Sequence, residues 1–176
     1  MSTTRPFVCD DLLAFNSVNL DVLTETYNMN FYGEYLSKWP DMFTYQESPG
    51  QRPISYILGK AEGTDKLWHG HVSAVTVSPE YRRIGVARRL MDGLERVSRD
   101  ICNAYFVDLF VRVTNTLAID MYKRFGYTVY RRVLGYYGGK EDAFDMRKAL
   151  PRDEAGESTV PLAEPVRPDQ LEKWTQ

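Results

Sequence analysis

The sequence has only two cysteines and two histidines among its 176 residues. Cys9 and Cys102 lie far apart, with neither the spacing of a metal site nor the number that a disulfide framework needs, so we expect two buried, reduced thiols. No apolar run is long enough to span a membrane, and the N-terminus lacks the basic and apolar regions of a signal peptide. These absences predict a cytoplasmic protein without membrane contact.

Neither sign of charge dominates, because the sequence has 22 basic and 24 acidic residues and a formal net charge of −2. The sequence therefore lacks the overall positive field that draws proteins to nucleic acid, and we predict no direct binding to DNA. Two common phosphate-binding patterns are missing as well. There is no Gly-x4-Gly-Lys-Ser/Thr loop and no three-glycine Rossmann turn. The length suits one domain with a sizeable core.

The most informative pattern that is present joins a predicted strand to a predicted helix. Residues 71–77 alternate and are rich in Val and Thr, which predicts a strand, and the apolar spacing beyond Gly85 predicts a helix to about Arg99. Between them lies Arg82-x-x-Gly85-x-Ala87, flanked by further arginines. The first N–H groups of a helix lack intrahelical acceptors, and the helix dipole favours an anion there. The motif thus predicts a pyrophosphate site, and a plain basic helix start is the alternative.

This order of a strand, the motif Arg/Gln-x-x-Gly-x-Gly/Ala and a helix resembles the GNAT acetyltransferases. In that superfamily the turn holds the pyrophosphate of acetyl-CoA. Ala87 stands where many members carry a second glycine. The resemblance implies acetyl-CoA as the cosubstrate and a set of residues that contact it. These are Val75, Val77, Arg82, Arg83, Gly85, Val86, Ala87, Arg88, Asn115 and Tyr122.

Strands alternate with helices along the rest of the chain and end in a hairpin, which predicts an α/β fold. The resemblance implies the GNAT fold, a mixed and mostly antiparallel central sheet flanked by helices. Predicted helices cover residues 10–18, 31–39, 85–99 and 115–125; predicted strands cover 3–8, 42–47, 54–62, 71–77, 104–113, 127–134 and 143–148. We expect an acetyltransferase domain over 1–150 and a proline-rich, charged tail over 151–176 without a core of its own.

Four blocks narrow the resemblance to one branch of the superfamily, the catalytic subunits of NatB-type N-terminal acetyltransferases. The blocks are residues 19–27, 68–71, 106–113 and 133–137. This resemblance implies acetyl transfer to the α-amine of nascent chains that begin Met-Asp, Met-Glu, Met-Asn or Met-Gln. The alternatives are a GNAT enzyme for lysine or small amines, and an inactive module that only binds acetyl-CoA.

Asn115 and Tyr122 are the predicted catalytic residues. Asn115 follows the strand 104–113, where it either bonds the pantetheine arm or simply caps the next helix. The resemblance places Tyr122 at the CoA sulfur as the general acid, and a buried core tyrosine is the alternative. An α-amine has a pKa near 8 and is partly neutral at cytosolic pH, so a weak base suffices. We assign no base, and we expect Asp108 to be a paired structural carboxylate.

His69 and His71 share one face of their strand. A His-x-His pair can bind metal, but no third ligand has suitable spacing, so we predict no metal site. The resemblance implies that His71 and Ser73 line the groove for the second residue of the substrate. A half-buried structural histidine is the alternative for His71.

Two loops are expected to close over the peptide. Glu25 and Tyr27 lie in the loop between the first two helices, and Tyr136 and Tyr137 lie in the loop before the last strand. By resemblance, these tyrosines fix the first backbone unit of the substrate and form an apolar methionine pocket with Phe110.

The first two predicted helices are rich in apolar and aromatic residues, which is consistent with an interface. These residues are Leu12, Leu13, Phe15, Phe31, Tyr32, Tyr35, Leu36 and Trp39. The resemblance implies a large helical-repeat auxiliary subunit as the partner, association with the ribosome through that subunit, and nascent polypeptide N-termini as substrates.

Overall fold

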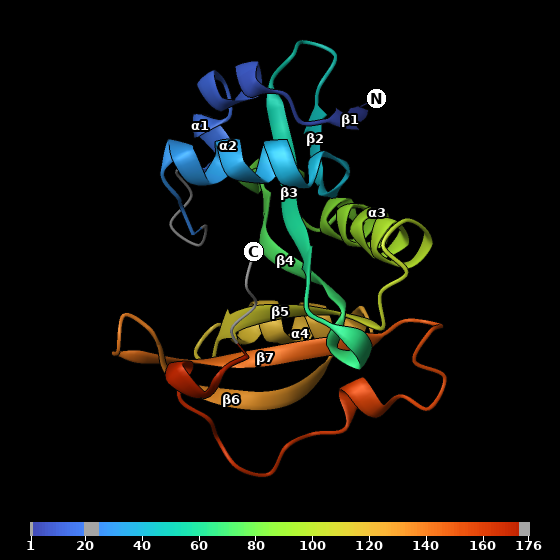
Figure 1. The fold of residues 1–176 in the computed structure, drawn as a ribbon. Helices are drawn as coiled ribbons and strands as arrows, with labels where there is room; N and C mark the ends of the chain where they lie inside the picture. Colours follow the sequence, from blue (N-terminus) through green and yellow to red (C-terminus); the bar gives the residue numbers. More distant parts are fainter. Residues whose placement is uncertain (1, 20–24, 173–176) are drawn as a thin grey trace. The chain divides into compact units, whose positions relative to one another are not determined.

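The structure is a computed structural model that describes residues 2–19 and 25–172. It divides into two compact units (Figure 1), residues 1–60 with 72–97 and residues 61–71 with 98–176. The predicted loop 19–30 and the predicted tail extend over residues 20–24 and 173–176, which lie outside the described residues. The division at residue 150 stays a prediction.

The strands of the first unit run in the order β1-β2-β3-β4. They are β1 (Thr3–Pro6), β2 (Phe43–Glu47), β3 (Pro53–Glu62) and β4 (His69–Val77), of which β3 ends and β4 begins in the second unit. The pairs β1–β2 and β2–β3 are antiparallel, with Tyr45 of β2 opposite Arg5 on one side and Tyr56 on the other. The predicted strands 42–47 and 54–62 are confirmed, and they pair as a hairpin.

The N-terminal helix differs from the prediction, because residues 10–18 do not form one continuous helix. A 3-10 turn (Cys9–Leu13) is followed by the short helix α1 (Asn16–Asn19). Asp11 does not start an α-helix: its carboxylate accepts from the backbone N–H of Val8 at 2.9 Å and from the guanidinium of Arg5 at 2.7 and 2.8 Å. These bonds fix the tighter turn.

The other two helices of this unit agree with the sequence pattern. In α2 (Met29–Lys38), the Asn28 side chain caps the N-terminus by accepting from the N–H of Phe31 at 2.9 Å. Pro40 follows the helix end, as expected. The helix α3 (Val86–Asp100) buries Val86, Leu90, Met91 and Leu94 along one face.

Aromatic side chains from β2, β3, α2 and the segments that follow β1 and the first 3-10 turn form the core of this unit. Phe7 and Phe43 stack at 3.8 Å between ring centroids, and Phe15, Tyr32 and Tyr35 are buried with them. These three residues therefore do not belong to an exposed interface, which corrects part of the predicted apolar surface. Leu13 is 81% exposed.

The second unit contains β5 (Phe106–Arg112), α4 (Thr116–Arg124), β6 (Thr128–Tyr137) and β7 (Glu141–Ala149). Its strands run in the order β5-β7-β6, and both pairs are antiparallel. The last two strands are longer than predicted, because Gly138 and Gly139 adopt positive φ of 63° and 75° and reverse the chain in a short turn. Tyr136 and Tyr137 consequently end β6 instead of lying in a loop.

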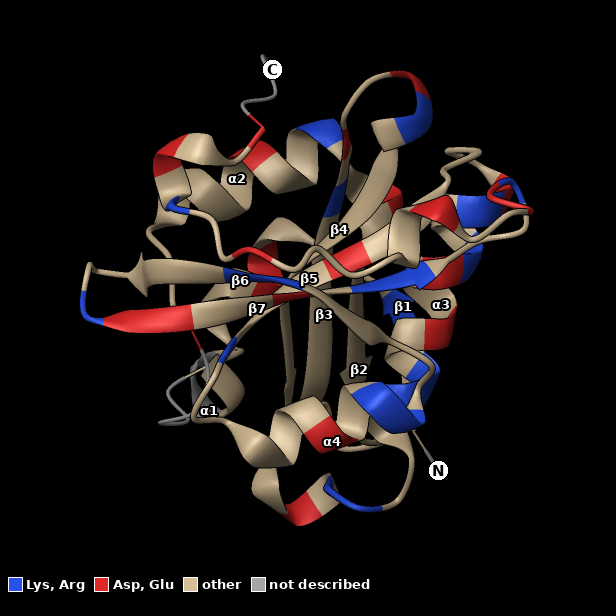
Figure 2. Ribbon diagram, turned by 90° about the horizontal axis from the view of Figure 1, so that it is seen from below, with Lys and Arg blue, Asp and Glu red and all other residues tan. Residues whose placement is uncertain are grey.

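The tail follows the edge of β6. The N–H of Leu162 donates to Tyr130 at 2.7 Å, and Val166 forms a parallel bridge with Val133. Acidic and basic residues lie next to one another on β6 and β7 (Figure 2), and Glu172 at the end of the described tail pairs with Arg131 of β6 at 2.6 Å.

Short 3-10 turns connect several elements: Pro40–Met42, Asp65–Leu67, Pro79–Tyr81, Glu157–Thr159 and Pro168–Gln170. Cys9 is exposed and Cys102 is partly exposed, so the prediction that both thiols are buried is wrong; neither cysteine forms a disulfide bond. Among the described helices, none has the length and apolarity that crossing a membrane requires.

Candidate active site

The predicted pyrophosphate turn connects β4 to α3 and has an unusual backbone. Arg83 and Gly85 both adopt the left-handed conformation, with φ of 67° and 82°. Glycine tolerates this conformation, whereas an arginine there carries local strain of the kind that gathers at binding turns. The guanidinium of Arg82 donates through Nε to the carbonyl of Val77 at 2.9 Å and ties the turn to the end of the strand.

The first turn of α3 fits an anion. Val86 is buried and anchors the helix start, while Gly85 and Arg88 are exposed beside it. The guanidinium of Arg88 pairs with Asp92 one turn along the helix at 2.8 Å. A helix of 15 residues presents several N–H groups without intrahelical acceptors at its N-terminus. The segment therefore has the backbone donors and basic side chains that a pyrophosphate requires, and the individual contacts stay predictions.

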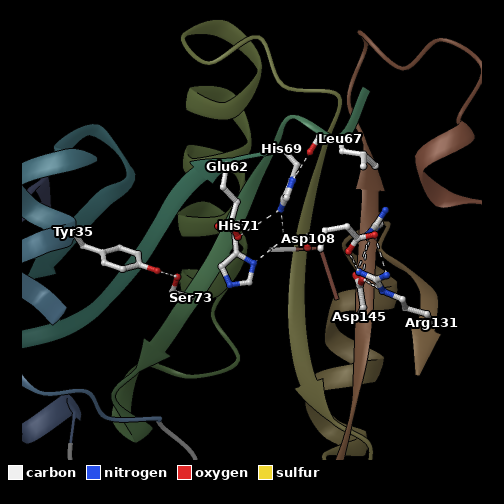
Figure 3. Close-up of polar contacts among 11 residues, drawn as sticks. Tyr35, Glu62, Leu67, His69, His71, Ser73, Asp108, Arg131 and Asp145 are labelled. Atoms are coloured by element: carbon white, nitrogen blue, oxygen red, sulfur yellow. Dashed lines mark hydrogen bonds and ion pairs between the residues drawn. The ribbon is translucent and has the colours of Figure 1, made fainter. Parts of the chain in front are cut away.

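Two tyrosines of the first unit hold Ser73 of β4. The hydroxyl of Tyr27 donates to the Ser73 carbonyl at 3.0 Å, and Tyr35 shares a hydrogen bond of 2.8 Å with the Ser73 hydroxyl (Figure 3). Phe31 stacks between the two tyrosine rings at 4.1 and 4.4 Å. The structure thus joins two of the predicted substrate residues, Tyr27 and Ser73, and adds Tyr35. Glu25 is exposed.

A buried carboxylate lies against the other predicted groove residue of β4. Asp108 of β5 is 4% exposed, and its Oδ1 lies 2.8 Å from Nδ1 of His71 (Figure 3). Burial opposes ionisation of Asp108, but the two histidines and the hydrogen bond from His71 outweigh it and hold its pKa well below the usual range. The expectation of a paired carboxylate is confirmed.

His69 approaches the same carboxylate. Its Nε2 lies 3.6 Å from Asp108 and 3.8 Å from Glu62, and its Nδ1 lies 2.6 Å from the carbonyl of Leu67. The ligand atoms of Glu62, His69 and His71 lie within 4.8 Å of one another, so the fold supplies the third donor that the sequence spacing did not reveal. His69 is hydrogen-bonded to the Leu67 carbonyl and His71 to Asp108, and the absence of a metal site stays a prediction.

Phe110, Tyr136 and Tyr137 form an aromatic wall in the second unit. The rings of Phe110 and Tyr136 stack at 4.6 Å, and the Tyr137 hydroxyl donates to the Phe110 carbonyl at 3.3 Å. Arg112 lies 4.0 Å over the Tyr137 ring and pairs with Glu141 at 2.6 Å. The structure brings these three predicted residues together and adds the Arg112–Glu141 pair that supports them.

Asn115 and Tyr122 both belong to α4. The Asn115 side chain accepts from the N–H of Ala118 at 3.1 Å, so its capping role is confirmed, and a contact with the pantetheine arm stays a prediction. Tyr122 is buried beside Tyr127, with ring centroids 5.9 Å apart. Burial raises the pKa of the Tyr122 phenol far above its ordinary value, so the group keeps its proton at neutral pH.

Sequence reasoning assigned Tyr35 to an interface and did not pair Asp108 with His71. For Asp108 a signal existed, because it is the one acidic residue within the largely apolar predicted strand 104–113. A charge in such a strand needs a buried partner of opposite charge or a hydrogen-bond donor. For Tyr35 the sequence contains no comparable signal.

Comparison with known proteins identifies the family. The chain matches the acetyltransferase (GNAT) family over residues 12–127. The N-terminal acetyltransferase B complex catalytic subunit NAA20 of Arabidopsis thaliana is 60% identical over 172 residues, which cover 98% of this chain and 99% of that protein.

Solved structures agree. The crystal structure of Chaetomium thermophilum Naa20 in complex with a bisubstrate analogue is similar with a TM-score of 0.88 and 42% identity, over 95% of this chain and 97% of that chain. The NatB acetyltransferase complex bound to a bisubstrate inhibitor gives a TM-score of 0.86 and 41% identity, over 97% and 99%. The chain therefore belongs to the GNAT acetyltransferases and, within them, to the acetyl-CoA-dependent catalytic subunits of NatB.

Proposed function

We propose that the chain transfers the acetyl group of acetyl-CoA to the α-amine of proteins that begin Met-Asp, Met-Glu, Met-Asn or Met-Gln. The contact of His71 with the buried Asp108 supports this selectivity most directly. Nδ1 of His71 lies 2.8 Å from Oδ1 of Asp108. An imidazole with one nitrogen fixed in this way can offer the other to the polar side chain of a second residue. All four substrate classes carry a side-chain carbonyl or carboxylate oxygen that accepts a hydrogen bond.

The chemistry needs few protein groups. Acetyl-CoA supplies the thioester, and the substrate amine attacks its carbonyl carbon, so that a C–N bond forms while the C–S bond breaks. A substrate α-amine with a pKa near 8 is partly neutral at cytosolic pH and loses its remaining proton to water. The departing thiolate takes a proton from Tyr122, whose burial keeps the phenol protonated, and the phenolate regains a proton from water, which has received the one released by the amide nitrogen.

The aromatic wall of Phe110, Tyr136 and Tyr137 suits the first residue of the substrate. The rings of Phe110 and Tyr136 stack, and the Tyr137 hydroxyl donates to the Phe110 carbonyl. Such a surface receives an unbranched methionine side chain through apolar and sulfur–aromatic contacts. In this proposal the tyrosines also fix the first backbone unit of the peptide.

The proposed partner is a large helical-repeat auxiliary subunit, through which the enzyme works at the ribosome in the cytoplasm. Two similar solved structures are of NatB acetyltransferase complexes, which supports a partner here. Leu13 and Met29, near and within the first helices, are 81% and 56% exposed and are available to an interface. Copurification of the chain with this subunit from cytoplasmic ribosome fractions tests the assignment.

Acetyl transfer to short peptides tests the substrate proposal. We expect the chain, with its auxiliary subunit, to acetylate a Met-Asp peptide much faster than a Met-Leu peptide or an N-terminally blocked peptide with an internal lysine. Turnover on the lysine peptide at the Met-Asp rate would instead favour the rival GNAT activity.

His71→Ala tests the site of selectivity. An unpaired polar group in a closed site costs about 1–3 kcal/mol, which corresponds to roughly a ten- to hundredfold effect. We expect His71→Ala to lower kcat/KM for Met-Asp by that factor and to leave the poor rate on Met-Leu nearly unchanged. Equal losses on both peptides would show that His71 supports the fold or the chemistry and not recognition.

A further inference from the structure

Asp108 is a deeply buried charged group beside His71, the predicted specificity residue. It is 4% exposed and sits in β5 between the buried residues Val107 and Leu109. Its Oδ1 lies 2.8 Å from Nδ1 of His71 and 3.6 Å from Nε2 of His69 (Figure 3). A carboxylate at this depth is costly unless its partners are fixed, so its geometry constrains theirs.

The contact determines which nitrogen of His71 carries a proton. An ionised carboxylate can only accept hydrogen bonds. The pKa of Asp108 is held low by His69 and His71 despite burial, so Asp108 is ionised at neutral pH. Nδ1 of His71 must therefore be the donor, and Nε2 is the nitrogen on the side of the ring away from Asp108.

His69 is the second histidine near this carboxylate, at 3.6 Å. A backbone carbonyl can only accept, so the 2.6 Å contact with Leu67 puts a proton on Nδ1 of His69. The His69 ring also stacks on Phe106, with centroids 4.7 Å apart and an angle of 3° between the planes. Asp108 thus has, besides His71, a second histidine 3.6 Å away that is itself held in place by Leu67 and Phe106.

We propose that Asp108 is a positioning residue for substrate selection, which holds His71 with Nδ1 protonated and favours the positive imidazolium so that Nε2–H donates to the second residue of the substrate. This inference rests on the proposed function. It adds a distinction between acidic and amide second residues, which His71 alone does not make. A carboxylate side chain in the substrate needs a donor at Nε2, whereas an amide can also donate its own N–H to a neutral Nε2.

Asp108→Asn separates these cases, because it keeps the shape and removes the charge that favours the imidazolium. We expect kcat/KM for a Met-Asp peptide to fall about tenfold or more and that for a Met-Asn peptide to fall by less than about threefold, mainly through KM. The matched control is Asp145→Asn on β7. Asp145 is also deeply buried, and it accepts hydrogen bonds from Arg131 and Arg147. The same change of ratio in Asp145→Asn, or an unchanged ratio in Asp108→Asn, overturns the proposal.

The tautomer can be read without any variant. Nitrogen-15 NMR of the histidine rings in the native enzyme should show His71 with Nδ1 protonated at all pH values at which the enzyme is folded and active. A neutral His71 that carries its proton on Nε2 alone overturns the proposal even if Asp108→Asn does not fold. Failure of the proposed function looks different: the enzyme would not prefer Met-Asp over Met-Leu, while the His71 tautomer would still be the one set by Asp108.

Discussion

Tyr122 combines a buried ring with a phenol that keeps its proton, because burial raises its pKa. A proton donor placed at a leaving thiolate contributes about 10²–10⁴-fold to the rate. We therefore expect Tyr122→Phe to lower kcat by about a hundredfold or more while the KM for peptide changes little. Steady-state kinetics with a Met-Asp peptide measures both.

Tyr127→Phe is the matched control for this experiment. Its ring lies 5.9 Å from that of Tyr122, and it is 1% exposed, so the same hydroxyl is removed from the same cluster. A kcat that falls equally in both variants would assign Tyr122 to packing and leave the general acid unidentified.

Asn115 has two candidate roles, as the cap of α4 and as a contact of the pantetheine arm, and the structure contains the cap. Its Oδ1 caps α4 by accepting from Ala118 at 3.1 Å, and loss of such a cap costs about 1 kcal/mol. Asn115→Asp retains an acceptor for the cap but loses the amide N–H donor. We expect this variant to keep the melting temperature of the wild type and to raise the KM for acetyl-CoA several-fold.

Asn115→Ala provides the comparison, since it removes both the cap and the donor. It should lower the melting temperature as well as raise that KM. If Asn115→Asp has the acetyl-CoA kinetics of the wild type, the residue is a cap only, and the pantetheine contact predicted from the family resemblance is wrong.

At the scale of elements, the turn before α3 carries the cofactor assignment. Gly85 has a φ of 82°, and a Cβ there would meet only the end of the Arg89 side chain, at 3.6 Å. A substitution therefore acts through backbone strain and charge, and a steric clash does not contribute. Gly85→Asp places a carboxylate at a helix N-terminus that we expect to bind pyrophosphate. The KM for acetyl-CoA should rise about tenfold or more.

Gly85→Ala introduces a comparable backbone strain, on the order of 1 kcal/mol, without the charge. We expect it to be destabilised but to bind acetyl-CoA far better than Gly85→Asp in a calorimetric titration. Equal affinities of the two folded variants would remove the turn from the cofactor site.

Most elements could be predicted because their patterns are local. The alternation in 71–77, the helical spacing after Gly85 and the Asn115 cap each depend on neighbours a few residues away, and the structure contains β4, α3 and α4 at these places. The prediction failed where a side chain competed with the pattern. Asp11 turns toward Arg5 and Val8 and tightens the N-terminal helix into a 3-10 turn.

The site could be predicted less well, because its geometry depends on contacts across the fold. His71 and Asp108 are 37 residues apart, and Tyr35 and Ser73 are 38 apart. Family resemblance indicated His71, Ser73 and Tyr27 as groove residues. It did not indicate that Asp108 bonds to His71 or that Tyr35 bonds to Ser73. Burial of a polar residue requires a partner without specifying which one, and only the register of the strands and the position of α2 specify it.

For the whole molecule, the tail is more closely bound than its composition suggests. Its backbone forms hydrogen bonds with the backbone of Tyr130, Arg132 and Leu134 in β6. Glu172 accepts two hydrogen bonds from the Arg131 guanidinium, at 2.6 and 3.2 Å. Burial opposes the charge of Arg131, which is 6% exposed, but Glu172 and Asp145 outweigh it and raise the pKa of Arg131. The tail thus neutralises a cation inside the second unit.

Glu172→Gln should therefore destabilise the chain, because Arg131 keeps Asp145 but loses its second carboxylate. Removing a charged partner from a largely buried pair costs about 1–3 kcal/mol. We expect a loss at the lower end of this range at pH 7, since Glu172 is partly exposed. Urea unfolding measures it, with Glu164→Gln as the control, because Glu164 is an exposed glutamate of the same tail.

The pH dependence of this difference follows from the sign of the shift at Glu172. Partial burial opposes its charge, but the hydrogen bonds from Arg131 outweigh burial and lower the pKa of Glu172 in the folded chain. Its stabilising contribution is therefore complete above the pKa of an unfolded glutamate, about 4.3, and is lost as the pH falls through the lower folded value. The stability gap between wild type and Glu172→Gln should be constant from pH 6 to 8, within the range well above ~4.3, and should close in acid. A gap that persists below the folded pKa, or one matched by Glu164→Gln, would show that the tail does not act on Arg131 through this charge.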